Sequence, residues 1–140
     1  MELAVLTFDA KAYECDIKLE SKIDSNIKFN FDTYSINELV EILLDNALKH
    51  ADKKSTIIVS LKEQGNNIIL SVIDTGDIIP KGEEEKIFER FYRLDKSRSR
   101  KENRYGLGLA IAKNIVFNHN GKISAESVGK VTTFKVLFKK

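Results

Sequence analysis

The sequence holds one cysteine, one proline and no long apolar run. Cys15 cannot form an internal disulfide, so we expect a reducing compartment and interpret it as a packing side chain rather than a nucleophile. No stretch approaches the roughly 20 apolar residues that span a bilayer, and no signal-peptide pattern is present. The formal net charge of the 140 residues is only +2, so composition demands neither nucleic acid nor an acidic partner. We expect one soluble domain, or a soluble part of a longer protein.

The first third of the chain begins with short element signals and then a long helix. Residues 1–15 carry apolar side chains without a complete amphipathic helix, and we interpret them as the tail of an element. Residues 16–19 and 26–31 alternate apolar and polar side chains, which predicts two strands. Ser35 with Glu38 is a capping box that predicts a helix start. The helix should bury one apolar stripe, made of Ile36, Leu39, Val40, Leu43, Leu44, Ala47 and Ala51.

The rest of the chain predicts a hairpin, a charged connection, a helix and two closing strands. Residues 55–62 and 67–74 form a strand pair. The segment 77–104 is poor in apolar residues and ends in a basic run, which lacks the interleaved aromatics of a nucleic-acid site. A helix resumes at Leu107 and should stop near Gly121, before strands over 122–127 and 131–138.

Three groups of residues suggest nucleotide chemistry. Helical geometry places Ile42, Asn46 and Lys49 within about 60° of one another and His50 within about 100° of all three, beside the apolar stripe. An amide and an ammonium in this position suit magnesium and phosphate, although a solvated helix face would look the same. Asp74 ends an apolar strand, so its carboxylate could accept a hydrogen bond from the adenine amine; a turn aspartate is the plain alternative. Glycines that open the last helix offer backbone N–H groups to phosphate.

Four motifs follow one another along the chain: Asp45-Asn-Ala-Leu-Lys-His50, Asp74-Thr-Gly76, Ile87-Phe-Glu-Arg-Phe91 and Tyr105-Gly-Leu-Gly108. In this order they resemble the ATP-binding catalytic domain of a bacterial sensor histidine kinase, in the GHKL superfamily of ATPases and kinases. The resemblance covers residues 16–140 and implies a two-layer α/β sandwich, a mixed sheet with helices on one face (the Bergerat-type fold). Residues 1–15 would then be a remnant of a dimerisation helix and its linker.

The resemblance implies that the chain binds ATP and Mg²⁺. Asn46 would ligate magnesium, while Lys49 and Arg93 would contact phosphate, so these three are the implied catalytic residues. Asp74 would read adenine. The other implied nucleotide contacts are His50, Gly76, Ile79, Phe88, Gly106, Leu107, Gly108, and Thr133, whose hydroxyl would support the adenine edge through water.

The chain departs from the family pattern at three places. Ile42 stands where the family often has a second asparagine, and where the gyrase, mismatch-repair and heat-shock ATPases place a glutamate that activates water. Glu41 cannot replace that glutamate, because it points about 140° away from Asn46 around the helix. Ile78 replaces a glycine of the first glycine motif, and residues 103–105 replace glycines of the second.

The implied activity is transfer of the γ-phosphoryl group of ATP to a histidine on a separate dimerisation domain, with a response regulator downstream. No acceptor motif is present, since His50 precedes Ala51, His119 precedes Asn120, and the only proline is Pro80. We expect a cytoplasmic domain of a membrane-anchored protein, with no nucleic-acid or membrane contact of its own. Two alternatives stay open: an anti-sigma-type serine kinase, which the Phe-Glu-Arg-Phe motif disfavours, and a degenerate nucleotide-binding interaction module without catalysis, with which the lost glycines are compatible.

Overall fold

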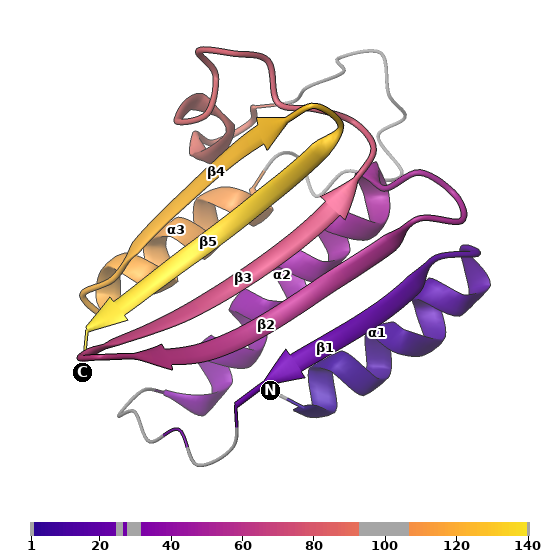
Figure 1. Cartoon of the computed structure of the whole chain (residues 1–140). Helices are drawn as coiled ribbons and strands as arrows, with labels where there is room; N and C mark the ends of the chain where they lie inside the picture. Colours follow the sequence, from indigo (N-terminus) through magenta and orange to yellow (C-terminus); the bar gives the residue numbers. More distant parts are fainter. Residues whose placement is uncertain (1, 25–26, 28–31, 93–106, 140) are drawn as a thin grey trace.

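The computed structural model describes residues 2–24, 27, 32–92 and 107–139. A five-stranded sheet in the order β1-β2-β3-β5-β4 forms one layer, and α1, α2 and α3 form a second layer on one face of it (Figure 1). Within these described residues, no helix is long and apolar enough to cross a membrane. The two-layer arrangement with helices on one face confirms the predicted fold class.

The sheet is mixed. β1 (Lys18–Ile23) runs parallel to β2 (Thr56–Gln64), and the remaining neighbours are antiparallel: β2 with β3 (Asn67–Thr75), β3 with β5 (Val131–Lys139), and β5 with β4 (Lys122–Val128). The predicted hairpin and closing strands are therefore confirmed. The first strand begins two residues later than predicted and runs four residues further, and most of the second predicted strand, 26–31, lies outside the described residues.

The N-terminal segment forms a complete helix, which the sequence pattern did not predict. α1 spans Glu2–Glu14 and packs against α2 and β1. Its side chains Ala4, Val5, Phe8 and Ala12 are buried in the same core as those of α2 and the sheet. The pattern was hard to recognise because three of these four residues are small and the exposed face also carries apolar side chains. That α1 derives from a dimerisation helix stays a prediction.

The long helix α2 spans Thr33–His50 and begins earlier than predicted. Asp32 is the N-cap, and its carboxylate accepts the Tyr34 N–H at 3.2 Å. Ser35 does not cap the helix; its hydroxyl instead donates to Asp32 Oδ2 at 2.8 Å, so the predicted capping box is wrong. The buried stripe is confirmed for six of its seven residues, with Ala51 only partly buried.

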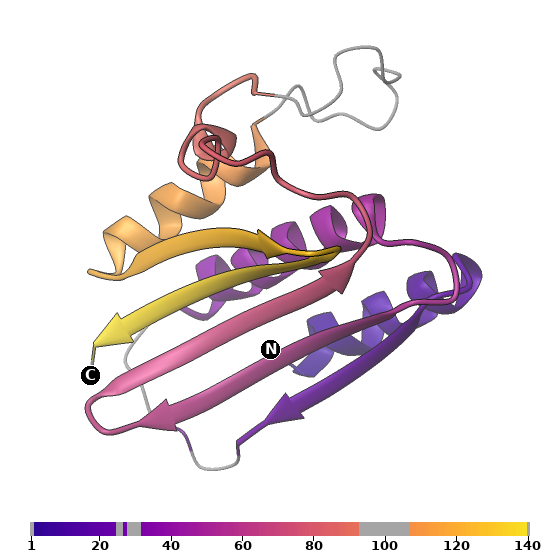
Figure 2. The same cartoon turned by 45° about the horizontal axis from the view of Figure 1, so that its top comes forward.

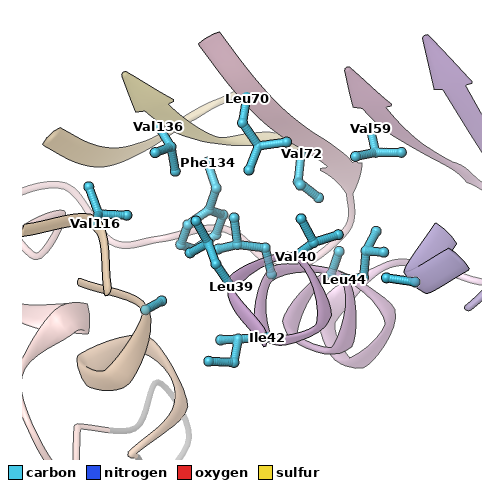
Figure 3. Close-up of a cluster of buried hydrophobic side chains, with 14 of the residues drawn as sticks. Leu39, Val40, Ile42, Leu44, Val59, Leu70, Val72, Val116, Phe134 and Val136 are labelled. Carbon is cyan, nitrogen blue, oxygen red and sulfur yellow. The ribbon is translucent and has the colours of Figure 1, made fainter. Parts of the chain in front are cut away.

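The core lies between α2, α3 and the helix-facing side of the sheet. Leu39 and Val40 of α2 meet Leu70 and Val72 of β3 there (Figure 3). Phe134 of β5 joins the same cluster and makes an edge-to-face contact with Phe88, with ring centroids 6.1 Å apart. Side chains packed this densely fix α2 against the sheet, so the residues on its flank have defined positions.

α3 spans Gly108–Asn118 and is linked to the start of α2 by a histidine. The Nδ1–H of His119 donates to the Ile115 carbonyl oxygen at 2.8 Å, and its Nε2 accepts the Asp32 N–H at 3.2 Å. The C-terminal end of α3 is thus tied to the N-terminal end of α2. His119, which carries no acceptor motif, thus has a structural role in connecting the two helices.

Candidate functional site

Three of the predicted site residues lie on one flank of α2. Asn46, Lys49 and His50 are partly exposed there. The side chains of Asn46 and Lys49 form no hydrogen bond or ion pair in the described part of the chain. The Nδ1 of His50 lies 3.1 Å from Asp77 Oδ2, so this histidine is already engaged with the loop after β3. An unengaged amide and ammonium on a helix packed against the sheet are available to a ligand.

The loop after β3 is attached directly to the end of α2. Ala51 and Gly76 form an isolated bridge, the Asp52 N–H donates to the Thr75 carbonyl oxygen at 2.8 Å, and the Asp77 N–H donates to the His50 carbonyl oxygen at 2.9 Å. A Cβ on Gly76 would collide with the His50 carbonyl oxygen and would lie 2.8 Å from Asp52 N. Gly76 is therefore required by this close approach of two backbones, whatever it contacts in a ligand.

Asp74 is a buried carboxyl without a cation. It lies on the helix-facing side of β3, is 5% exposed, and forms no ion pair among the described residues. Burial raises its pKa to about 7, and the nearby carboxylates of Asp77 and Asp52 add to the shift. A buried carboxyl without an ion-pair partner lowers the stability of the fold. Groups with strongly shifted pKa values of this kind are concentrated at functional sites.

The hydroxyl beside Asp74 belongs to Thr132, not to Thr133. Thr132 pairs with Asp74 across β3 and β5, whereas Thr133 pairs with Ile73 and lies on the opposite face of the sheet. The structure therefore contradicts the supporting role predicted for Thr133. Strand alternation could have corrected it, because Phe134 faces the core and Thr132, two residues earlier, must share its face.

Thr132 belongs to a hydrogen-bonded network that holds the loop after Asp74. Its Oγ1 lies 2.6 Å from Ser127 Oγ and donates to the Asp77 carbonyl oxygen at 3.3 Å. Ser127 Oγ accepts the Ile79 N–H at 2.8 Å, which holds the buried Ile79 near the adenine-reading candidate. Sequence reasoning missed Ser127 because serine in a closing strand gives no specific signal.

An ion pair joins the β4–β5 turn to the loop after α2. Lys130 Nζ lies 2.7 Å from Asp52 Oδ2, and this hydrogen bond raises the pKa of Lys130 above its usual value. The Gly76 N–H also donates to the Lys130 carbonyl oxygen at 2.9 Å. The side chains of Lys130 and Asp52 are both exposed, so the ion pair adds little to the free energy of unfolding. Its main effect is to hold the β4–β5 turn next to the loop after α2.

The first two residues of the aromatic motif, Ile87 and Phe88, lie in a short 3-10 helix, η1 (Lys86–Phe88), within the charged connection. Phe88 is buried against Phe134, so it anchors the segment in the core, while its implied nucleotide contact stays a prediction. The hydroxyl of Tyr92 donates to Glu83 Oε1 at 2.7 Å, and burial together with this bond raises the pKa of Tyr92 to about 12. The predicted phosphate contact Arg93 lies outside the described residues.

The N-terminal end of α3 is open to an anion. Leu107 is the N-cap and its side chain makes no capping hydrogen bond. Gly108 follows, and a Cβ there would lie 3.7 Å from Ile42 Cγ2, an ordinary contact that packing would tolerate. The start of α3 thus faces α2 at Ile42, one turn before Asn46. Gly106, predicted to contact phosphate, lies outside the described residues.

The relation to known proteins agrees with this geometry. Residues 31–140 match the family model of the histidine kinase-, DNA gyrase B-, and HSP90-like ATPases. The histidine kinase ArlS of Staphylococcus aureus (strain USA300) is 38% identical over 127 residues, which make up 90% of this chain and 28% of ArlS. The chain therefore spans little more than a quarter of this relative.

Solved structures share the fold. The catalytic domain of the histidine kinase ThkA superposes with a TM-score of 0.86 at 23% identity, covering 99% of this chain and 90% of that domain. Full-length ShkA, solved in complex with AMPPNP, superposes with a TM-score of 0.84 at 19% identity, covering 98% of this chain and 28% of ShkA. The family model matches most of the length of this chain. The chain therefore belongs to the histidine kinase-, DNA gyrase B- and HSP90-like ATPases.

Proposed function

We propose that the chain is the ATP- and Mg²⁺-binding catalytic domain of a sensor histidine kinase, and that it transfers the γ-phosphoryl group of ATP to a histidine on another domain. One observation carries the proposal: a buried carboxyl without a cation, Asp74, is joined through the Gly76 bridge to the helix that bears Asn46 and Lys49. Adenine-reading and phosphate-binding groups are thereby held in one rigid arrangement.

Asp74 would select the base. Its ionised form can accept a hydrogen bond from the exocyclic amine of adenine, whereas guanine has a carbonyl at that position. Binding would favour the ionised form and so lower a pKa that is raised to about 7 in the nucleotide-free domain. Thr132, which shares the face and the register position of Asp74, is the hydroxyl placed to support this contact.

Asn46, Lys49 and the start of α3 would bind the triphosphate. Asn46 offers a neutral amide oxygen and Lys49 a point charge, while the first N–H groups of α3 point out of an uncapped helix end. No cluster of three metal-binding side chains occurs in the described part of the chain. One protein ligand suits magnesium, which is commonly held by few protein oxygens together with phosphates and water. When bound, the ion would offset phosphate charge during transfer.

Among the described residues, we find no water-activating base and no acceptor histidine placed to divert the phosphoryl group from another domain. Ile42 is 7% exposed and apolar at the position from which related ATPases activate water, so hydrolysis has no base there. His50 contacts Asp77, and His119 holds α3 to α2, so neither histidine is placed as an acceptor. The acceptor should therefore come from a separate dimerisation domain.

Partners and location follow from the same proposal. The chain covers 28% of ArlS, so the longer protein would supply the dimerisation domain, and a response regulator would act downstream. ThkA has been solved in complex with the response regulator TrrA, which supports that expectation. We also propose that the domain works in the cytoplasm, attached to a membrane-anchored protein. The predicted roles of Arg93 and Gly106 in phosphate binding remain part of this proposal.

Phosphotransfer in trans tests the proposal directly. The chain is incubated with γ-labelled ATP, magnesium and the histidine-containing domain of ArlS, and the label is examined for acid lability. We expect acid-labile phosphate on that domain and none on the chain alone. Asn46→Ala should abolish the transfer, whereas Asn114→Ala on the exposed side of α3 should not. Stoichiometric labelling of His50 or His119, or rapid ATP hydrolysis without transfer, would contradict the proposal.

A further inference from the structure

The sheet has one face that no described helix covers. Figure 2 shows the three helices on one side of the sheet and the other side without a second layer. Strand alternation puts onto this side the residues that do not face the core, and we call it the open face. Its centre is formed by Ile58 and Ser60 of β2, Ile69 and Ser71 of β3, and Leu137 of β5, all partly exposed.

Half of the open face carries a concentrated positive charge. Five exposed lysines lie on it, toward the end of the sheet that holds the β2–β3 turn and the end of β5, and we call them the lysine patch: Lys22, Lys62, Lys122, Lys135 and Lys139. The register places Lys22 beside Ser60, Lys135 beside Ser71, and Lys122 beside Leu137. Every strand except β3 contributes, so the charge spreads across the full width of the sheet.

The lysine patch is not neutralised within the described residues. None of its five ammonium groups forms an ion pair there, whereas Lys18, outside the patch, pairs with Glu20 at 3.3 Å. The strand acids of this face, Glu20 and Glu126, lie in the row of Ile58 and Ile73, toward the nucleotide end. Asp24, just beyond β1, continues the register to the place beside Lys62 and accepts the Glu63 N–H at 3.3 Å, so one carboxylate lies next to the five ammonium groups. The open face is therefore locally basic, although the net charge of the whole chain is only +2.

The open face lacks the features of a specific protein interface. Its strand residues include no aromatic residue, no methionine and no arginine, because Phe134 and Phe138 of β5 face the core. Protein interfaces are enriched in aromatics and arginine, depleted in lysine, and anchored by a few deeply buried side chains. A broad, flat group of lysines around small and aliphatic residues instead fits a partner whose charge is spread over a plane.

We propose that the lysine patch rests on the anionic headgroups of a lipid bilayer. Neighbouring strands are about 5 Å apart and alternate residues about 7 Å apart, so the five charges fall within roughly 20 Å by 15 Å. Each lysine at an anionic membrane surface contributes about 1 kcal/mol, and the attraction extends about 8 Å at physiological ionic strength. The long lysine stems let the ammonium groups reach the headgroups while the sheet stays outside the hydrocarbon.

The position of the patch leaves the nucleotide site free. Asp74 faces the helices near the C-terminal end of β3, while the lysine patch lies on the other face and near the opposite end of that strand. A bilayer on the patch would thus orient the site away from the lipid. This proposal departs from the composition-based expectation that the domain makes no membrane contact, and it does not depend on the proposed kinase activity.

Vesicle flotation tests the proposal. The chain is mixed with vesicles of phosphatidylcholine alone or of phosphatidylcholine with phosphatidylserine, at low and at high salt. We expect binding only to the anionic vesicles, weakening as salt rises. The double variant Lys62→Glu/Lys135→Glu should bind at least about tenfold less, because it reverses two central charges of the patch. The matched control Lys53→Glu/Lys113→Glu changes the net charge equally outside the patch and should bind nearly as well as the native chain.

Both double variants change exposed side chains, and their circular dichroism and ATP affinity verify that each is folded. Equal losses in the two double variants would show that overall charge, not the patch, matters. Absence of binding to anionic vesicles, or equal binding to neutral ones, would overturn the proposal. Binding to an acidic polypeptide such as polyglutamate would also overturn the proposal if the Lys62→Glu/Lys135→Glu variant lost that binding and the native chain did not bind vesicles. The partner of the patch would then be a protein.

Discussion

α2 and α3 border the proposed nucleotide site and differ in how their ends next to it are held. α2 has a side-chain cap at Asp32 and seven buried residues, and its last turn is bridged to β3 through Gly76. α3 has three buried residues and no side-chain cap at its start. The two helices are tied together by His119 at the end remote from the site. The difference suggests two requirements of a phosphate site. Side chains such as those proposed on α2 need a helix that is held in place, whereas the backbone N–H groups proposed at the start of α3 need a helix end without a side-chain cap.

The largest expected effect comes from breaking the bridge that fixes α2. Gly76→Ala places a methyl group against the His50 carbonyl oxygen, and neither backbone can move without loss of the Asp52 and Asp77 hydrogen bonds. We expect the free energy of unfolding to fall by more than about 3 kcal/mol. Urea denaturation measures the effect.

Gly129→Ala is the matched control. Gly129 has φ +62°, and no atom lies within 4 Å of where an alanine Cβ would stand, so the substitution tests backbone strain alone and should cost about 1 kcal/mol. If both glycine variants lose equal stability, the close approach of α2 and β3 is not what requires Gly76.

The buried carboxyl at this fixed end should make stability depend on pH. Asp74 has a pKa of about 7 in the folded chain against 3.8 unfolded, so the folded state binds its proton more tightly. Its favourable contribution is complete below about pH 4 and is lost as the pH rises through about 7. Asp74→Asn should therefore be more stable than the native chain at pH 8, by on the order of a few kcal/mol, with little difference at pH 4.

Thermal or urea unfolding at several pH values tests this dependence. Asp52→Asn should show no such gain, because the Asp52 carboxylate is exposed and bonded to Lys130. A native chain whose stability does not fall between pH 5 and pH 8 relative to Asp74→Asn would contradict the assignment of a buried, unpaired carboxyl.

A substitution of Asn46 tests the side-chain contribution of α2 separately from the backbone contribution of α3. Asn46→Ala removes the proposed magnesium ligand without changing the backbone N–H groups of α3. We expect ATP affinity in magnesium to fall about tenfold, the value of one neutral polar contact, and affinity in a metal chelator to change little. Titrations with and without magnesium measure the difference, and equal losses would show that Asn46 is not a ligand.

The smallest effect is expected at the remote link between the helices. His119→Ala removes two hydrogen bonds near the surface and should lower the free energy of unfolding by about 1 kcal/mol. ATP affinity should be nearly unchanged, because the link lies at the end away from the site. An affinity loss larger than the stability loss would mean that α3 depends on this link for its position at the nucleotide.

The sequence allowed the framework of the site to be predicted better than its details. Periodicity identified α2 and its buried stripe, because this signal is local, whereas the binding roles of Asn46, Lys49 and Asp74 stay predictions. The sequence pattern assigned the N-cap of α2 to the wrong residue. Asp32 and Ser35 are both good capping residues, and only the fold distinguishes them. The pattern chose Thr133 over Thr132 because two adjacent threonines differ only in the face to which alternation assigns them.

Long-range contacts explain the rest. The bridge of Gly76 to Ala51 and the bond from Asp32 to His119 join residues that no sequence pattern links. α1 was not recognised because its buried face is made partly of alanines, which give little periodic contrast. The lysine patch collects residues from four strands, so it exists only once the sheet has formed.

The central claim is that Asp74 reads adenine beside the phosphate-binding flank of α2. Calorimetric titration of ATP and GTP into the native chain and into Asp74→Ala tests it most directly. We predict that the native chain prefers ATP, and that the variant stays folded but binds ATP about 10- to 100-fold more weakly while GTP binding changes little. Unchanged ATP affinity in folded Asp74→Ala would contradict the account.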